Sequence, residues 1–489
     1  MALALPALLC LASGLALVCL GWSRRAPLAS DLLLRASMSV GFGVGIFSID
    51  FFVSRVLGVS NLLAVDLLVF TALLAAFFLL RTRAPIRDLS PSKEKLEGPE
   101  WLRRILTVAF AIALCAALYA ALMRIIAHPQ GDGWDAFAIW NLHARFLFRG
   151  GPHWRDGFSP LIPWSHPDYP LLLPAATAHF WTYLGRDDPR APAVISLLFT
   201  FSTVGLLFSA ISILRRRTPA LLGGLALLAT PFFIEQGRSQ YADVPLSFFF
   251  LATIALFSLH DDDSDDPSAS RSPGLLVLAG LACGFAAWTK NEGLLFLCAV
   301  VLARLFILIR PKTHHDASHQ TAQKRPQETR RNRWIALTPF LAASAPAFLL
   351  VLWFKHSVGP PRDLLSDPTT VLHKLLDPSR YWAILKWYGK GFLRFGDWLL
   401  IPGTLLMIGA YFTVGGGDCR KSDPAFRSSV LSLLLTLAGY FAVYLITPYD
   451  LYWHLRFSLT RLFLQLWPST IFLFFLAVPC GAGTPARGR

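Results

Sequence analysis

Long apolar runs recur along the whole chain, separated by short polar connections. A helix crosses the hydrocarbon core of a bilayer with about 20 mostly apolar residues, because only a fully hydrogen-bonded backbone is stable there. The pattern predicts an all-α fold, a polytopic bundle of about thirteen transmembrane helices. The predicted helices cover 2–22, 36–56, 61–80, 105–125, 190–214, 220–234, 244–259, 274–289, 293–310, 335–354, 397–414, 428–446 and 462–479.

Three of these runs carry a further expectation. The runs 220–234 and 244–259 are short for a full span, so tilted, broken or re-entrant helices are expected there. The first run, 2–22, is similar to a signal peptide, but its basic residues Arg24 and Arg25 follow the apolar stretch instead of preceding it. We therefore expect a retained helix whose N-terminus faces outward.

Basic residues mark the connections on one side of the membrane. Lys and Arg collect in cytoplasmic connections of membrane proteins, and here they cluster between alternate runs. The predicted cytoplasmic connections hold Arg24–Arg25, Arg81–Arg104, Arg215–Arg217, His260–Arg271, Arg310–Arg333, Asp418–Arg427 and Arg487–Arg489. The connections 127–189 and 355–396 then face the periplasm or exterior of an inner (plasma) membrane protein.

Composition supports this class and excludes others. Hydrophobic residues make up 54% of the chain and charged residues 15%, whereas a soluble domain carries about 25% charged residues. The mean hydropathy is +0.51. The net charge of +15 is spread over connections rather than gathered on one domain, so no nucleic-acid partner is expected. Most of the seven cysteines lie in apolar runs, which favours packed, unpaired thiols.

Carboxylates, cations and aromatic residues gather in the external connections. The connection 127–189 opens with Gly-Asp-Gly-Trp-Asp at 131–135, and later polar groups lie at 235–243, 290–293 and 449–461. Ionisable residues at the edges of apolar helices are costly and tend to mark functional sites. Considered one at a time, these residues also fit simpler structural roles. The aromatic rings suit an interfacial belt, the cations suit headgroup anchors, and the two aspartates suit a helix cap before Ala136.

This arrangement resembles the GT-C glycosyltransferases, and within them glycosyltransferase family 39, the protein O-mannosyltransferase and aminoarabinose transferase group. The shared features are an acidic residue that opens a long first external loop, a helix behind it, and a glycine about fifteen positions on, as with Asp135 and Gly150. The elements Tyr241–Leu246 and Trp288–Gly293 add to the likeness, which covers roughly 105–310. The chain departs from the family in Asp135-Ala136, where Asp-Glu is usual, and in three additional N-terminal helices.

The resemblance implies transfer of a sugar from a polyprenyl-phosphate donor to a glycolipid, glycan or protein acceptor on the extracytoplasmic face. An inverting transfer needs a carboxylate base, for which Asp135 is the first candidate and Asp132 the second. Cations for the donor phosphate are expected at Lys290, Arg238, Arg456 and Arg461. The remaining substrate-binding candidates are Trp134, Trp140, His166, Tyr169, Tyr241, Asp243, Glu292, Trp453 and His454. A divalent metal would find oxygen and nitrogen ligands here, although no ligand spacing demands one, and no other cofactor is indicated.

Four regions follow from this pattern. Residues 1–104 form additional transmembrane helices and a basic cytoplasmic loop, and 105–310 form the catalytic core with the loop 127–189. Residues 311–334 form a cytoplasmic basic loop, and 335–489 form C-terminal helices with the loop 355–396.

Two other functions remain open from the sequence. A transporter or flippase for polyprenyl-linked sugars would place polar groups at the bilayer midplane, often within inverted repeats. A non-catalytic protein of cell-envelope assembly would tolerate substitution of the external carboxylates.

Overall fold

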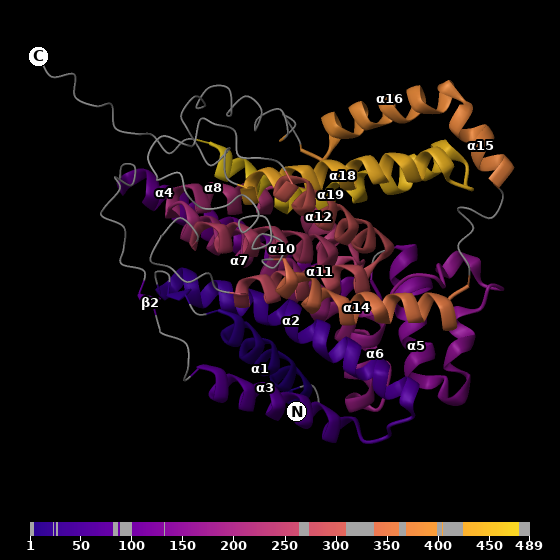
Figure 1. Ribbon diagram of the computed structural model, residues 1–489, viewed down its shortest axis with the longest axis horizontal. Coiled ribbons are helices and arrows are strands. Elements are labelled where there is room, and N and C mark those ends of the chain that lie inside the picture. The colour runs from indigo at the N-terminus through magenta and orange to yellow at the C-terminus, as the bar shows by residue number, and fades with distance from the viewer. Residues whose placement is uncertain are drawn as a thin grey trace, which may run out of the picture.

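The computed structural model describes residues 4–22, 24–25, 28–81, 87–88, 100–131, 133–263, 273–309, 337–360, 368–398, 403 and 424–478, which fold almost wholly as helices (Figure 1). The N-terminal elements are α1 (Ala4–Gly21), β1 (Arg24–Arg25), α2 (Leu28–Leu57), α3 (Leu62–Arg81), β2 (Arg87–Asp88) and α4 (Glu100–Ala127). The first long loop contains η1 (Ala136–Trp140), α5 (Asn141–Arg149), η2 (Gly151–Phe158), η3 (Pro163–Ser165) and α6 (Leu172–Leu184).

The central and C-terminal elements follow. They are α7 (Arg190–Leu214), α8 (Arg217–Leu228), α9 (Pro231–Arg238), α10 (Asp243–Asp263), α11 (Pro273–Thr289), α12 (Asn291–Ile309), α14 (Thr338–Ser357), α15 (Pro368–Leu376), α16 (Pro378–Arg394), α18 (Pro424–Ile446) and α19 (Leu451–Ala477). The predicted helical bundle is therefore confirmed. The run 397–414 lies almost entirely outside the described residues, and every other predicted run coincides with a helix.

Nine helices of the described part are long and apolar enough to cross a membrane, or up to ten when α8 and α9 count as one broken span. The expected break in 220–234 is present, because α8 and α9 meet at 66°. The break falls at Thr230, which is extended and precedes Pro231. The ring of a proline disfavours helical geometry in the residue before it and removes one backbone donor. By contrast, the run 244–259 is part of a longer, unbroken helix, α10.

The largest error in a predicted boundary lies at the start of α19. The sequence placed 449–461 in a connection, but α19 begins at Leu451. The side chain of Asp450 accepts a hydrogen bond from the backbone of Trp453 and caps the new N-terminus. The polar residues from Trp453 to Arg461 therefore project from the first turns of a helix rather than from a loop.

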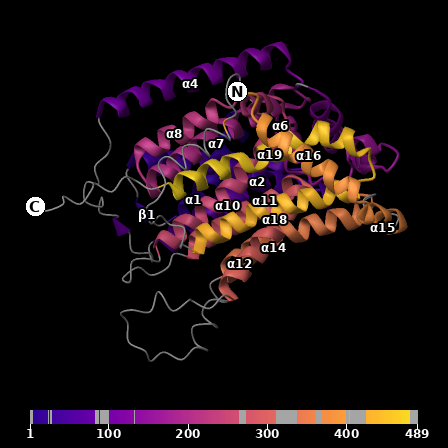
Figure 2. The same cartoon turned by 90° about the horizontal axis from the view of Figure 1, so that it is seen from above.

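The connections divide between two ends of the bundle. At one end Gly21 approaches Gly274, and Asp261 pairs with Arg304. At the other end, the site end, Lys290 pairs with Asp243. Figures 1 and 2 show α5, α6 and α15 at the site end and β1 and β2 towards the opposite end. The predicted grouping of the connections 127–189, 235–243 and 290–293 at one end is therefore observed.

Helix α10 forms the centre of the bundle and packs against α7, α11 and α19 (Figure 2). Its apolar span is buried completely. Such a helix can be apolar on all sides because protein rather than lipid surrounds it. Its first residue, Asp243, is therefore held inside the site end, where it has no exposure.

Candidate active site

Asp243 is the centre of a buried polar network at the site end. Its Oδ1 accepts from Lys290 Nζ at 3.1 Å and from Gln465 Nε2 at 2.6 Å, and its Oδ2 accepts from Arg461 Nε at 2.8 Å. A buried carboxylate is tolerable only when cations and donors replace its hydration. Asp243 is the first residue of α10, Lys290 directly precedes α12, and the other two residues lie in α19. The network therefore holds these three helices together at the site end.

Arg461 connects this network to the first long loop. Its Nη1 lies 2.8 Å from Asp135 Oδ2, while its Nη2 lies 2.8 Å from Asp243 Oδ2. The guanidinium group also lies over the ring of Tyr241, 4.7 Å from the ring centroid. The planar fork of arginine suits such a bridge between two carboxylates. Arg461 therefore holds Asp135 in a defined position.

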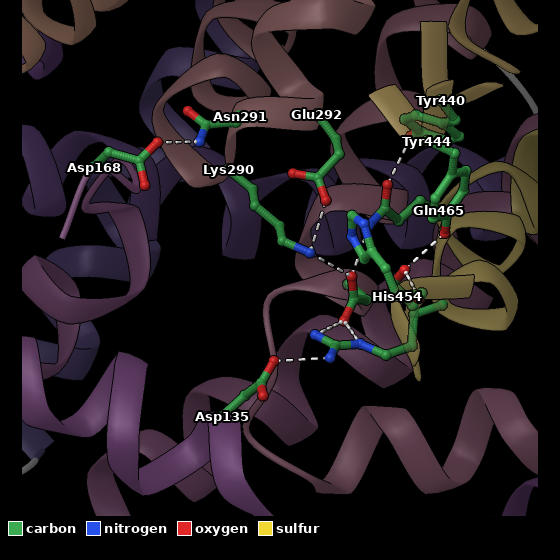
Figure 3. Close-up of polar contacts among 12 residues, drawn as sticks. Asp135, Asp168, Lys290, Asn291, Glu292, Tyr440, Tyr444, His454 and Gln465 are labelled. Carbon is green, nitrogen blue, oxygen red and sulfur yellow. Dashed lines mark hydrogen bonds and ion pairs between the residues drawn. The ribbon is translucent and has the colours of Figure 1, made fainter. Parts of the chain in front are cut away.

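Lys290 lies between two carboxylates. Besides Asp243, its Nζ lies 2.9 Å from Glu292 Oε1 (Figure 3). Burial alone would lower the pKa of Lys290, but the Asp243 and Glu292 carboxylates outweigh it and raise that pKa. The ammonium group remains charged. These two contacts use two of its three N–H donors, and the ring of Tyr169 lies 5.8 Å away.

Asp135 lies near the start of the first long loop, directly before η1. Gly131 and Gly133 have φ values of 91° and 89°, a region that residues with a side chain rarely adopt. A Cβ at Gly133 would lie 2.5 Å from the Tyr241 hydroxyl, so the backbone passes directly against that ring. Asp135 precedes η1 but makes no capping hydrogen bond with its side chain. A helix-capping role for Asp135 is therefore not supported, and its carboxylate is instead turned to Arg461.

Aromatic rings from the loop line one side of the network. Tyr169 stacks on His166 at a centroid distance of 4.6 Å and on Trp140 at 5.7 Å. His166 has a left-handed backbone conformation with φ of 50°, which a non-glycine residue rarely adopts. Flat aromatic surfaces next to charged groups are typical of sites that bind sugar rings or other polar ligands with apolar faces.

A second carboxylate, Asp168, fixes this loop to the bundle. Its Oδ2 accepts from Asn291 Nδ2 at 2.8 Å (Figure 3), and its backbone oxygen accepts from Lys355 Nζ at 2.8 Å. Asn291 begins α12 and Lys355 lies near the end of α14. Two helices therefore hold the segment that carries Tyr169.

The back of the network is formed by the last two helices. Gln465 donates to Asp243, and its Oε1 accepts from the hydroxyl of Tyr440 at 2.6 Å (Figure 3). His454 Nδ1 and Thr447 Oγ1 are 2.9 Å apart. Gln465 and Tyr440 were not among the sequence candidates. A glutamine one turn after Arg461, inside an apolar helix, was the available signal for the first of them.

The pKa values of two loop histidines are lowered in this environment. Burial lowers the pKa of His143 to about 3, with a smaller contribution from His166. Burial also lowers the pKa of His166, against the opposing effects of Asp168 and Asp135. His143 has no exposure and lies near Ser165, so it packs inside the loop and does not face the interface.

The loop cations expected to anchor headgroups have protein partners. Arg145 and Arg149 both pair with Asp187. The pKa of Asp188, the next residue, is lowered well below its usual range, chiefly by hydrogen bonding to Arg190. These ion pairs hold α5 against the start of α7.

Three sequence candidates lie at exposed positions beside the network. Trp134 and Trp453 pack on Phe137 and on Phe457, respectively. Arg456 lies on the outer face of α19, near the ring of Phe457. Two further candidates stand apart from these: Arg238 is the half-buried last residue of α9, and Asp132 lies outside the described residues.

No group of three or more His, Cys, Asp or Glu side chains among the described residues has the geometry to hold a metal ion. The cysteines of the described part, Cys10, Cys19, Cys115, Cys283 and Cys298, are free thiols. Cys10 and Cys283 are buried, as the expected packing requires, whereas Cys115 and Cys298 are exposed.

One small cavity adjoins the network, and a second lies further from it. The first is lined by Trp140, Asn141, Gln240 and Tyr241 together with residues of α6 and α7. The second is almost wholly apolar and lies between α1, α2, α6 and α7. Ile195 lines both cavities, so they lie on either side of one residue of α7.

A comparison with protein families gives a match to the middle of the chain. Residues 192–357 match the dolichyl-phosphate-mannose-protein mannosyltransferase family. Searches of curated proteins and of solved structures each gave no match. The family match confirms the resemblance drawn from the sequence and supports a multi-pass membrane glycosyltransferase of the mannosyltransferase type.

The extent of the match differs from the extent expected from the sequence, 105–310. The mannosyltransferase match starts inside α7 and continues through α14. It includes Tyr241, Asp243, Lys290 and Glu292 but neither the first long loop nor α19. The structure alone brings Asp135 and Arg461 to the matched residues.

Proposed function

We propose that this protein transfers a sugar from a polyprenyl-phosphate donor to an acceptor hydroxyl on the extracytoplasmic face, with inversion at the anomeric carbon. The observation that carries the proposal is the ion-pair chain Asp135–Arg461–Asp243–Lys290–Glu292. It joins the first long loop, α10, the start of α12 and α19 at one end of the bundle. A membrane glycosyltransferase needs such a group of charged residues where a lipid-linked donor meets water.

Asp135 is the proposed general base. In the reaction, the acceptor oxygen forms a bond to the anomeric carbon while its proton moves to an Asp135 carboxylate oxygen. The bond between the anomeric carbon and the phosphate oxygen breaks, and polyprenyl phosphate leaves with the electron pair. Arg461 binds Asp135 Oδ2 at 2.8 Å, which leaves Oδ1 for the acceptor. A positioned base contributes about 10²–10⁴-fold to the rate.

Lys290 is the proposed cation for the leaving phosphate. Arg461 already uses Nε, Nη1 and Nη2 on two carboxylates, so its role is to position Asp135. Lys290 keeps one N–H donor beyond its contacts with Asp243 and Glu292. A fixed donor aimed at developing negative charge stabilises the transition state more than the ground state.

The donor and acceptor are proposed to lie on opposite sides of Lys290 and Asp135. Tyr169, which is partly exposed and rests on the buried ring of Trp140, offers an aromatic surface for a sugar ring. The apolar cavity between α1, α2, α6 and α7 offers an apolar surface for part of a polyprenyl chain. The polar groups lie at one end of the bundle instead of its middle, which favours a transferase over a transporter.

The test is a transfer assay with the purified protein in lipid vesicles and radiolabelled polyprenyl-phosphate sugars. Release of polyprenyl phosphate together with labelled acceptor is the expected result. Intact movement of the labelled donor between leaflets, without release of phosphate, would instead establish a flippase.

The proposed orientation has its own test. Single cysteines at Trp134 and at Glu235, both exposed, are expected to react with an impermeant thiol reagent added from outside the cell. Labelling of the two positions from opposite compartments would exclude a common external site.

A further inference from the structure

A second buried polar cluster lies between the additional N-terminal helices and α6. Asp66 of α3 and His179 of α6 have no exposure, and Asp50 of α2 faces them from the third side. These residues lie outside the segment that matches the mannosyltransferase family and outside the ion-pair chain proposed for catalysis. An ionisable group buried among transmembrane helices is expensive and marks a function by default.

One oxygen of Asp66 is fully satisfied. Its Oδ2 lies 2.9 Å from His179 Nε2 and also accepts from the hydroxyl of Tyr183. The imidazole of His179 is surrounded by the rings of Phe47 at 5.1 Å, Phe51 at 6.3 Å and Phe180 at 5.5 Å. Among the described residues, His179 Nδ1 has no hydrogen-bond partner in this aromatic surrounding. Because Asp66 Oδ2 is an acceptor, Nε2 carries the proton of this hydrogen bond.

The other oxygen of Asp66 has no N–H or hydroxyl donor within the described chain. Asp66 Oδ1 and Asp50 Oδ2 are both buried and both lack such a partner, although the two carboxyl groups are in hydrogen-bonding contact with each other. Two carboxylates in direct contact cannot both be ionised, because their charges repel and neither offers a proton. A single proton between them satisfies both oxygens at once.

The charges around the pair do not neutralise it. In the part of the chain that the structure describes, His179 is the only cationic type of residue that pairs with Asp66, and Asp50 has no ion pair. Arg55, one turn further along α2, donates to the carbonyl of Gly151. The thiol of Cys10 is the group that faces Asp66 from α1. Asp31, at the other end of α2, shows the contrast, because it is paired with Arg35.

We propose that Asp50 and Asp66 form a proton-binding site in which one proton is shared between Asp50 Oδ2 and Asp66 Oδ1. The proton joins α2 to α3, and the bonds of Asp66 to His179 and Tyr183 extend the connection to α6. Because α6 directly follows the segment that carries Tyr169, the same proton also helps to hold this segment of the external loop in place. The site does not depend on the proposed transfer reaction.

Infrared difference spectroscopy of the purified protein in lipid tests the site. The wild-type protein is expected to show the carbonyl stretch of a protonated carboxyl group near neutral pH. Asp50→Asn is expected to lose that band while remaining folded, because its amide donates permanently to Asp66 Oδ1. Asp66→Asn serves as the second variant, since the new amide can accept from His179 and Tyr183 and donate to Asp50. Asp31→Asn, on the same helix, is expected to retain the band.

The outcomes distinguish a shared proton from a bound monovalent cation. An unchanged band in both Asn variants would overturn the proposal. So would a melting temperature that rises with sodium concentration but not with acidity, because a monovalent cation would then occupy the pair. The proposal also requires the wild-type melting temperature, measured relative to that of Asp50→Asn, to fall as the pH rises above about 4, where exposed aspartate has already lost its proton. The same relative fall is expected for Asp31→Asn.

Discussion

Arg461 Nη1 lies 2.8 Å from Asp135 Oδ2, which joins the start of the first long loop to the last helix of the described chain. The same guanidinium group binds Asp243, the buried first residue of α10. Displacement of α19 relative to α10 would therefore move the proposed base. This coupling makes Asp135 and Arg461 the residues on which the proposed mechanism is most directly tested.

Replacement of the proposed base should stop the reaction without unfolding the protein. We expect Asp135→Asn to lower kcat by about 10²–10⁴-fold, because an amide cannot take up the acceptor proton. Its oxygen still accepts from Arg461, so the abundance in the membrane should not change. The matched control is Asp156→Asn in the same loop, whose exposed side chain lies 3.8 Å from His153. An active Asp135→Asn enzyme would remove Asp135 from the mechanism.

Loss of Arg461 should destabilise the protein, in contrast to loss of its neighbour on the same helix. Arg461→Met leaves the fully buried Asp243 without one of its two cations, and breaking a buried ion pair costs about 3–5 kcal/mol. Arg456→Met, at an exposed position of α19, should change stability by less than about 0.5 kcal/mol. Thermal unfolding of the two variants in lipid makes the comparison. Equal melting temperatures would contradict the central role of Arg461.

The buried His143 should make the loop sensitive to acid. Burial lowers its pKa to about 3 in the folded protein, against 6.5 for an exposed histidine. Between these values the unfolded chain binds a proton that the folded chain does not. The contribution of His143 to stability should therefore fall as the pH decreases from 6.5 towards 3, with a slope approaching about 1.4 kcal/mol per pH unit, opposite in sign to the contribution expected from Asp50 and Asp66.

Unfolding measured across this pH range in His143→Gln provides the test. The variant should lose most of the slope, whereas His153→Gln, at a largely exposed position of the same loop, should keep it. If both variants retained the wild-type slope, the acid sensitivity would arise elsewhere.

The two hydrogen bonds that hold Asp168 should matter for substrate binding. Asn291→Ala removes the hydrogen bond to Asp168 Oδ2, and Lys355→Met removes the one to its backbone oxygen. A hydrogen bond to a charged group contributes about 1.5–3 kcal/mol, so each change should lower kcat/KM by roughly tenfold or more by loosening the loop that carries Tyr169. The two losses should not add fully in the double variant, because both act on one residue. Full additivity would indicate separate effects.

The sequence identified many residues of the candidate site but not the contacts between them. Asp135, Asp243, Lys290, Glu292 and Arg461 were all named from their position at helix ends. Their pairing was not, and two cations expected to bind phosphate turned out to be engaged by Asp243. The identity of a residue and its place at a membrane edge do not specify which neighbour it meets.

Other residues could not be found in the same way. Gln465 and Tyr440 lie inside apolar helices, and their contact with the network depends on which face of α18 and α19 is turned inward. Asp50 and Asp66 also lie in apolar runs, away from the external connections in which the sequence gathers its charged groups. Only the packing of α2, α3 and α6 makes them a pair.

The sequence by itself determined the membrane class, the positions of nearly all spans and the residues that reach one end of the bundle. These features depend on the transfer free energy of each segment, which its own composition sets. The tertiary structure decided the charge partners, the direction of the Asp135 side chain and the start of α19. Such features depend on helix rotation and on contacts between distant segments, and no local pattern of residues encodes them.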